Sequence, residues 1–175
     1  KNLLCIVLFF PVLSLYGQYA NTTKPVYTSV NEALAADDPK QLNLRDQHLF
    51  DVPENIEKLH GITFLNLMKN HLEFWDERIF ELTSLEVLNV KENQLKTIPT
   101  EISKLENIIR LDMATNQFKL VPEAIGSLNK LKFLHLRENY IHSISPEIKN
   151  CSNLELLELN SNQLSYLPES IGELS

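Results

Sequence analysis

The stretch Leu88–Pro99 reads LNVKENQLKTIP and has the form L-x-L-x-x-N-x-L-x-x-L-P, with valine at the second apolar position and isoleucine at the last. The same frame begins again at Leu65, Leu111, Leu134 and Leu157, and in degenerate form at Leu42. The asparagine of every full copy recurs with a period of 23 residues. Self-similarity at a fixed period is the signature of a stacked-repeat protein. The pattern therefore decides the architecture, although it names no ligand.

Each copy opens with two apolar residues that flank a polar one, which predicts a short strand with one buried face. The pairs are Leu42/Leu44, Leu65/Leu67, Leu88/Val90, Leu111/Met113, Leu134/Leu136 and Leu157/Leu159. One copy cannot bury its apolar residues alone, whereas stacked copies bury them in a continuous core. Successive strands should pair in parallel, about 4.8 Å apart. The return segment starts with proline in four copies, which favours a helical turn there.

The repeated asparagines need a structural partner, because burying an unpaired amide is costly. A chain that turns sharply out of a strand loses ladder partners for its backbone groups. A side-chain amide has two donor hydrogens and an acceptor oxygen that can satisfy such groups in neighbouring copies. We therefore predict a structural asparagine ladder, not a ligand site, made of Asn70, Asn93, Asn116, Asn139 and Asn162.

The first twenty residues have the composition of a secretory signal peptide. Lys1 is followed by the apolar run Leu3–Leu13 and then by small or polar residues around Gly17 and Ala20. This order is typical of a cleaved signal, with cleavage after Gly17 or after Ala20. A transmembrane anchor is the alternative, but the run is short of the roughly 20 residues that span a bilayer. We expect a secreted, periplasmic or cell-surface protein.

Residues 21–40 are expected to hold a spacer and a short capping helix. Ser29 and Glu32 have capping-box spacing, and Val30, Ala33 and Leu34 share one helical face. The first repeat of a stack needs a cover with a polar outer face, and this helix has a suitable size. An unstructured linker is the alternative. Residues 41–175 then form six repeats, and we expect the natural protein to continue beyond Ser175, because nothing covers the last repeat.

The repeat resembles the leucine-rich-repeat family, in its 23-residue class with an L-P-x-x-I-x-x-L second half. The resemblance implies an α/β fold, a right-handed β/α horseshoe solenoid with a parallel sheet on its concave side. The signal-like start, the short leading helix and the absence of cysteine-rich caps are similar to secreted or surface members from bacteria. Two copies depart from the pattern: Asp76 replaces proline after Trp75, and Ser145 precedes a displaced Pro146.

Composition excludes some functions. The formal net charge is -7 and Lys1 is the only charge in the first twenty residues, so the remainder carries about -8. An acidic chain without a basic stripe is a poor nucleic-acid ligand. Cys151 falls in a column otherwise occupied by leucine, so we interpret it as a small buried hydrophobe. No cofactor is expected, because four glycines leave little material for a phosphate-binding loop.

Candidate binding residues lie at the outward positions of the predicted concave sheet. A row of apolar residues interrupted by arginine precedes the first leucine of each copy, and such rows often mark interaction surfaces. The predicted anchors are Phe64, Val87, Arg110, Phe133 and Leu156. The predicted orienting residues are Asn89, Lys91, Asp112, His135, Arg137 and Glu158. Alternatively, the first column lies at the sheet margin, partly buried under adjoining loops.

Two clusters invite a chemical interpretation that we do not favour. Asp112, His135 and Glu158 share one column, but an open surface with no nucleophile suits a charged contact patch better than catalysis. His48 and His71 lie one repeat apart, fewer than the three or four ligands of a typical zinc site. The sequence thus predicts a non-enzymatic module that binds a protein or peptide partner. A scaffold for a further, possibly catalytic, domain and glycan binding are the alternatives.

Overall fold

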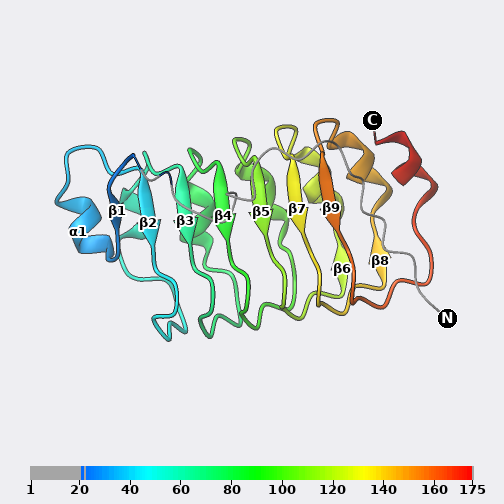
Figure 1. The fold of residues 1–175 in the computed structure, drawn as a ribbon, viewed down its shortest axis with the longest axis horizontal. Helices are drawn as coiled ribbons and strands as arrows, with labels where there is room; N and C mark the ends of the chain where they lie inside the picture. The colour runs from blue at the N-terminus through cyan, green and yellow to red at the C-terminus, as the bar shows by residue number, and fades with distance from the viewer. Residues whose placement is uncertain (1–20, 22, 175) are drawn as a thin grey trace.

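Seven short parallel strands lie side by side in one sheet in the computed structural model, which describes residues 21 and 23–174 (Figure 1). In sheet order they are β1 (Val26–Tyr27), β2 (Gln41–Asn43), β3 (Phe64–Asn66), β4 (Val87–Asn89), β5 (Arg110–Asp112), β7 (Phe133–His135) and β9 (Leu156–Glu158). From β2 to β9, each residue pairs with the one 23 positions later, as Leu65 does with Leu88. The sequence period is therefore the register of the sheet, and the chain forms the predicted solenoid.

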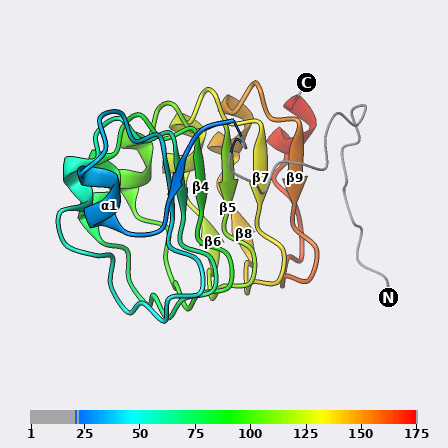
Figure 2. The same ribbon diagram turned by 60° about the vertical axis from the view of Figure 1, so that its left-hand side comes forward.

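The return segments form short 3₁₀ helices that stack behind the sheet (Figure 2). They are η1 (Ile56–Lys58), η2 (Glu77–Glu81), η3 (Thr100–Lys104), η4 (Glu123–Ser127), η5 (Pro146–Asn150) and η6 (Glu169–Glu173). Proline directly precedes η3, η4 and η6. In the second copy Asp76 takes over this role, because its Oδ1 accepts a hydrogen bond from the Arg78 N–H at 3.0 Å. The missing proline thus leaves the helical turn intact.

The displaced proline of the fifth copy adds a contact. Ser145 has a backbone N–H where proline would have none, and it donates to the Val121 carbonyl at 2.9 Å. This bond lies at the end of a second, two-stranded parallel sheet of β6 (Leu120–Val121) and β8 (Ser143–Ile144). The backbone of this return segment therefore differs from that of the other copies, because it pairs with the preceding copy through β6 and β8.

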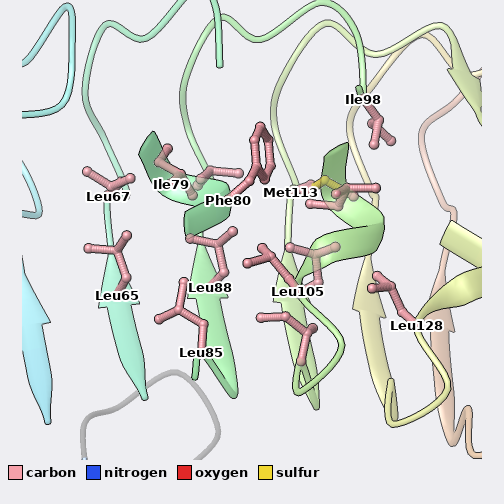
Figure 3. Close-up of a cluster of buried hydrophobic side chains, with 14 of the residues drawn as sticks. Leu65, Leu67, Ile79, Phe80, Leu85, Leu88, Ile98, Leu105, Met113 and Leu128 are labelled. Carbon is pink, nitrogen blue, oxygen red and sulfur yellow. The ribbon is translucent and has the colours of Figure 1, made fainter. Parts of the chain in front are cut away.

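One hydrophobic core runs the length of the solenoid between the sheet and the 3₁₀ helices. Figure 3 shows Leu65 and Leu67 on the strand side facing Ile79 and Phe80 from η2. All four are essentially inaccessible to solvent. Cys151 is also buried, with its Sγ 3.2 Å from the Ile125 carbonyl oxygen, and burial raises the pKa of the thiol to about 11. It behaves as the small hydrophobe that the sequence predicts.

The predicted helix before the first repeat forms as α1 (Val30–Leu34). Ser29 Oγ accepts from the Glu32 N–H at 3.2 Å, and the Glu32 carboxylate reaches back to the Thr28 N–H at 3.3 Å. Val30 and Ala33 are buried in the end of the core. Across residues 21 and 23–174, the structure contains no helix that is both long and apolar enough to cross a membrane. The predicted signal peptide, residues 1–20, lies outside the described residues.

Candidate binding surface on the concave sheet

The asparagines that set the period join the backbones of adjacent repeats. Asn116 Nδ2 donates to the carbonyls of Val90 and Met113 at 3.0 and 3.2 Å, and its Oδ1 accepts from the Leu95 N–H at 3.1 Å. Asn70, Asn93, Asn139 and Asn162 make the same kinds of bond. Since the donors and the acceptor are all used, by the side chain's own repeat and by the preceding one, these side chains offer nothing to a ligand.

A second polar column closes the ends of β2, β3, β4 and β5. The residue between the two inward apolar positions accepts the N–H two residues ahead: Asn89 from Lys91 at 2.9 Å and Asp112 from Ala114 at 3.1 Å. Asn43 and Asn66 do the same. Asn89 and Asp112 are only 4 % and 3 % exposed. They were expected to orient a partner, but as buried side chains they present little surface. An Asn or Asp in four consecutive copies was the signal for this turn.

The predicted anchors form one continuous row, but they are not freely exposed. Phe64 pairs with Val87, Val87 with Arg110, Arg110 with Phe133, and Phe133 with Leu156. Phe64 is buried at 6 % exposure, which contradicts its expected place on the accessible surface. The other four are half-buried. The row is therefore partly covered, as the sheet-margin alternative expected, and its accessible part begins at Val87.

A compact cluster occupies the middle of this row. The Arg110 guanidinium lies 4.0 Å from the ring centroid of Phe133, a cation–π contact. Its Nη1 is 3.0 Å from His135 Nε2, and His135 Nδ1 is 2.8 Å from Glu158 Oε2. Burial lowers the pKa of Arg110 from its ordinary value. The fold holds these four side chains in one arrangement before any partner arrives.

Asp112, His135 and Glu158 are indeed neighbours, because the sheet pairs Asp112 with His135 and His135 with Glu158. Burial raises the pKa of Asp112, an effect that the charges of His135 and Lys91 oppose. Both ring nitrogens of His135 already have partners in the protein, on Arg110 and Glu158. A general base needs a free nitrogen within reach of a substrate, so this geometry suits a structural ion-pair network better than proton transfer.

The remaining two predicted residues, Lys91 and Arg137, lie two positions beyond the ends of β4 and β7. Lys91 Nζ is 3.2 Å from Glu92 Oε1, and the Lys91 side chain is 13 % exposed. Arg137 Nη1 is 3.3 Å from Glu138 Oε1, and its side chain is more accessible, at 38 %. Both basic groups thus have an acidic neighbour within their own copy. Such partly exposed pairs contribute little stability and can be rearranged by a ligand.

Another group of accessible side chains was not predicted from the sequence. Most of the exposed large hydrophobic residues in the described part of the chain follow a ladder position by one to four residues, when Gln47 is counted as the ladder position of the first copy. They are Phe50, Phe74, Leu120, Tyr140 and Tyr166. Phe50 and Phe74 are 70 % and 77 % exposed. The sequence did contain a signal for this group, because these apolar residues fall outside the repeated columns that form the core.

This solenoid, with a parallel sheet on one side, 3₁₀ helices on the other and an asparagine ladder between repeats, defines a class of repeat protein. Family models described as leucine rich repeat match residues 60–118 and residues 153–174. The chain belongs to the leucine-rich-repeat family. No curated protein sequence matches it.

Three solved structures are similar to this chain. A leucine-rich-repeat protein of Leptospira interrogans superposes with a TM-score of 0.73 at 25 % identity, covering 86 % of this chain and 45 % of that protein. The ectodomain of the Arabidopsis thaliana receptor kinase GASSHO1/SCHENGEN3, in complex with CASPARIAN STRIP INTEGRITY FACTOR 2, has a TM-score of 0.69 at 32 % identity, covering 78 % of this chain and 17 % of the ectodomain. The plant peptide hormone receptor RGFR1, in complex with RGF2, has a TM-score of 0.69 at 32 % identity and covers 77 % and 23 %. The chain therefore spans less than half the length of each.

Proposed function

We propose that this chain is a recognition module of a secreted or cell-surface protein and that its concave sheet binds a protein or peptide partner. The observation that carries the proposal is the half-buried row Val87, Arg110, Phe133 and Leu156, which adjacent strands bring into register. Aromatic side chains and arginine are the residue types that dominate interface energies. A row of them along the sheet suits an extended segment that crosses the strands.

The rigidity of the row supports binding. The Phe133 ring and His135 hold Arg110, and Glu158 holds His135 in turn. Binding costs free energy when flexible side chains must be ordered, and a surface that is already ordered avoids much of that cost. Lys91 and Arg137 flank the row and can exchange their acidic neighbours for acidic groups of a partner.

The similar structures support the same class of function. The structures of the two plant receptors are of complexes, with CASPARIAN STRIP INTEGRITY FACTOR 2 in one and with RGF2 in the other. This chain corresponds to a small part of those ectodomains, so the comparison supports a binding surface and leaves the identity of the ligand open. We further propose a non-enzymatic role, which the same comparison and the engaged nitrogens of His135 support.

We also propose that the protein is secreted. It rests on the charge and apolar run of residues 1–20 and on the similarity to receptor ectodomains. We further propose the division into a signal peptide at 1–20, a spacer with a capping helix at 21–40 and repeats at 41–175. Mass spectrometry of the protein expressed in its own host should find a mature N-terminus at Gln18 or Asn21. An uncleaved N-terminus would contradict secretion by this route.

The binding proposal is tested by affinity capture with the full chain as bait. Wild type is compared with a triple variant, Lys91→Glu, Arg110→Glu and Arg137→Glu. A matched control carries the same change in charge away from the sheet, at the exposed Lys119, Lys130 and Lys149. A protein or peptide that wild type and control retain and the concave variant loses would support the concave face.

Circular dichroism and thermal unfolding must show that the concave variant is folded, because Arg110 is partly buried. Phe133→Ala serves as a second variant that leaves the net charge unchanged. If the partner binds all folded variants equally, the concave face is not the binding surface. Capture of polysaccharide instead of protein would contradict the proposed partner class.

A further inference from the structure

Two histidines from adjacent repeats bring one ring nitrogen of each close together. His48 Nδ1 lies 3.5 Å from His71 Nε2. The two rings are stacked, with planes within 19° of parallel and centroids 5.6 Å apart, so the nitrogen-to-nitrogen distance is shorter than the distance between the centroids. His48 is exposed and His71 is half-buried. Solvent therefore reaches the pair.

The separation of the two nitrogens is long for a hydrogen bond and suits a shared ligand. Bonds from nitrogen donors cluster near about 2.9–3.0 Å and lose their meaning by about 3.6 Å. Two imidazole nitrogens on one tetrahedral ion, each about 2.05 Å from the metal, lie about 3.3–3.4 Å apart. The observed 3.5 Å is within the roughly 0.2 Å tolerance that a metal site allows.

The fold fixes the backbone beside the pair and packs one ring against His71. The backbone N–H of His71 donates to the Leu49 carbonyl at 2.7 Å, and the Leu49 N–H donates to Asn70 Oδ1 at 3.0 Å. The Phe50 ring packs against His71, with centroids 5.1 Å apart. His48 and His71 belong to adjacent copies 23 residues apart, so the repeat spacing sets their separation. A pre-arranged pair binds an ion more tightly than two mobile side chains, because less side-chain freedom is lost.

We propose that His48 and His71 form a two-residue binding site for a late first-row divalent transition ion, of which Ni²⁺, Cu²⁺ and Zn²⁺ are the members suited to imidazole. Neutral imidazole is a ligand for these ions, whereas Mg²⁺ and Ca²⁺ prefer oxygen. Within residues 21 and 23–174, no three histidine, cysteine or acidic side chains gather closely enough to hold a metal. Water or a group from another molecule completes the coordination sphere. The site is thus open, unlike a structural zinc site.

The surrounding charge does not oppose a cation. Asp46, a carboxylate, stands two residues before His48 in the chain. The Lys69 ammonium is itself paired with Asp46 at 2.8 Å, so its positive charge is offset. At the same position of the third repeat stands Gln94, which ends the run of imidazoles. The column therefore offers one pair only.

The experiment is a calorimetric titration of the untagged full chain with NiCl₂ and with ZnCl₂. The test variants are His48→Asn and His71→Gln. Asparagine tolerates the positive φ of 56° at position 48. Glutamine already occupies the position equivalent to His71 in the following repeat, as Gln94. The exposed His60 and His142 supply matched controls, His60→Asn and His142→Gln. MgCl₂ is the control ion.

We expect one site in wild type and in both controls, no binding of Mg²⁺, and affinity lower by at least about tenfold in either test variant, the scale of loss seen when a histidine ligand is disturbed. Nickel should also raise the melting temperature of wild type more than that of the test variants, since a ligand of the folded state stabilises it. Binding that is equally tight without His48 or His71, or no binding by wild type, overturns the proposal. Neither result affects the concave face.

Discussion

Arg110 Nη1 approaches His135 Nε2 to 3.0 Å, and this contact determines which imidazole nitrogen carries the proton. A guanidinium can only donate, so Nε2 of His135 must accept. The hydrogen then resides on Nδ1, which donates to Glu158 Oε2 at 2.8 Å. We predict that the neutral imidazole of His135 is the Nδ1–H tautomer. Long-range ¹H–¹⁵N correlation spectra distinguish the two tautomers, and an Nε2–H form in the free protein would contradict the arrangement.

Asp112→Asn should stabilise the protein at neutral pH. Burial raises the pKa of Asp112 above its ordinary value of 3.8, so the folded state binds this proton more tightly than the unfolded state. The carboxylate consequently destabilises the fold as pH rises past that ordinary value, and the cost is absent below it. Asn89 shows that asparagine makes the same turn one repeat earlier.

The expected gain for Asp112→Asn is about 1 kcal/mol in the free energy of unfolding at pH 7, the usual size of a single-substitution effect. It should shrink as pH falls toward 3.8. Urea unfolding of wild type and variant at several pH values measures it. A loss of stability at pH 7, or a gain that grows on acidification, would show that attraction to His135 and Lys91 outweighs desolvation.

Asn116→Ala should be among the most destabilising substitutions away from the apolar core. It would leave the Leu95 N–H and the carbonyls of Val90 and Met113 without their side-chain partner. Each buried group left unpaired costs about 1–3 kcal/mol, so a total loss of about 3 kcal/mol is expected. Gln117→Ala, at the half-buried neighbouring position, is the control and should change stability by under about 0.5 kcal/mol. If denaturant unfolding showed that the two substitutions lower the free energy of unfolding equally, the ladder would not have the proposed structural role.

Gly126→Ala should destabilise η4 against η5, because a Cβ at this position would overlap the main-chain carbonyl of Glu147. Backbone atoms cannot move aside as a flexible side chain can, and overpacking of this kind costs about 1–3 kcal/mol. Gly172→Ala offers the comparison: a Cβ there meets nothing within 4 Å. That change should be neutral or favourable by about 0.5 kcal/mol. The prediction fails if thermal unfolding shows the two variants to be alike.

Thr115→Gly should stabilise the turn out of β5. Thr115 has a positive φ of 54°, and a β-branched residue is especially unfavourable in that region. Asp46, Lys69, Glu92, Glu138 and Ser161 share this conformation directly before their ladder positions. Glycine adopts it without strain, and the expected net gain is about 0.5–1 kcal/mol. A lower melting temperature would mean that the hydrogen bond from Thr115 to Glu138 outweighs the strain.

The architecture could be predicted from the sequence because a strict period constrains every copy at once. The 23-residue spacing specified the strand pairs, the core columns and the side of the sheet on which Leu65 and Leu88 lie. Burial on the concave face could not be predicted in the same way. Whether Phe64 is covered while Phe133 stays half-exposed depends on neighbours above and beside the sheet, and those do not follow from alternation along one strand.

The contacts of single side chains were least predictable. Asp112, His135 and Glu158 were expected to be neighbours, yet the position of Arg110 against Phe133 and His135 depends on side-chain rotamers. The same holds for His48 and His71, whose spacing was visible but whose nitrogen-to-nitrogen distance was not. Hydrogen bonds from side chains to the local backbone could be predicted in part from the sequence. The Ser29 cap was predicted, whereas the bonds by which Asn89 and Asp112 close their strands were overlooked.

The register of the sheet also bears on how the molecule comes apart. Its inter-repeat hydrogen bonds join residues about one period apart, as between Asn116 and Val90 or Gln47 and Asn70. Stability is then close to a sum of repeat terms and nearest-neighbour interface terms. Unfolding should start at a terminal repeat and proceed to the neighbouring repeats one after another. A weakened copy in the middle would divide the solenoid into two segments that melt at separate temperatures.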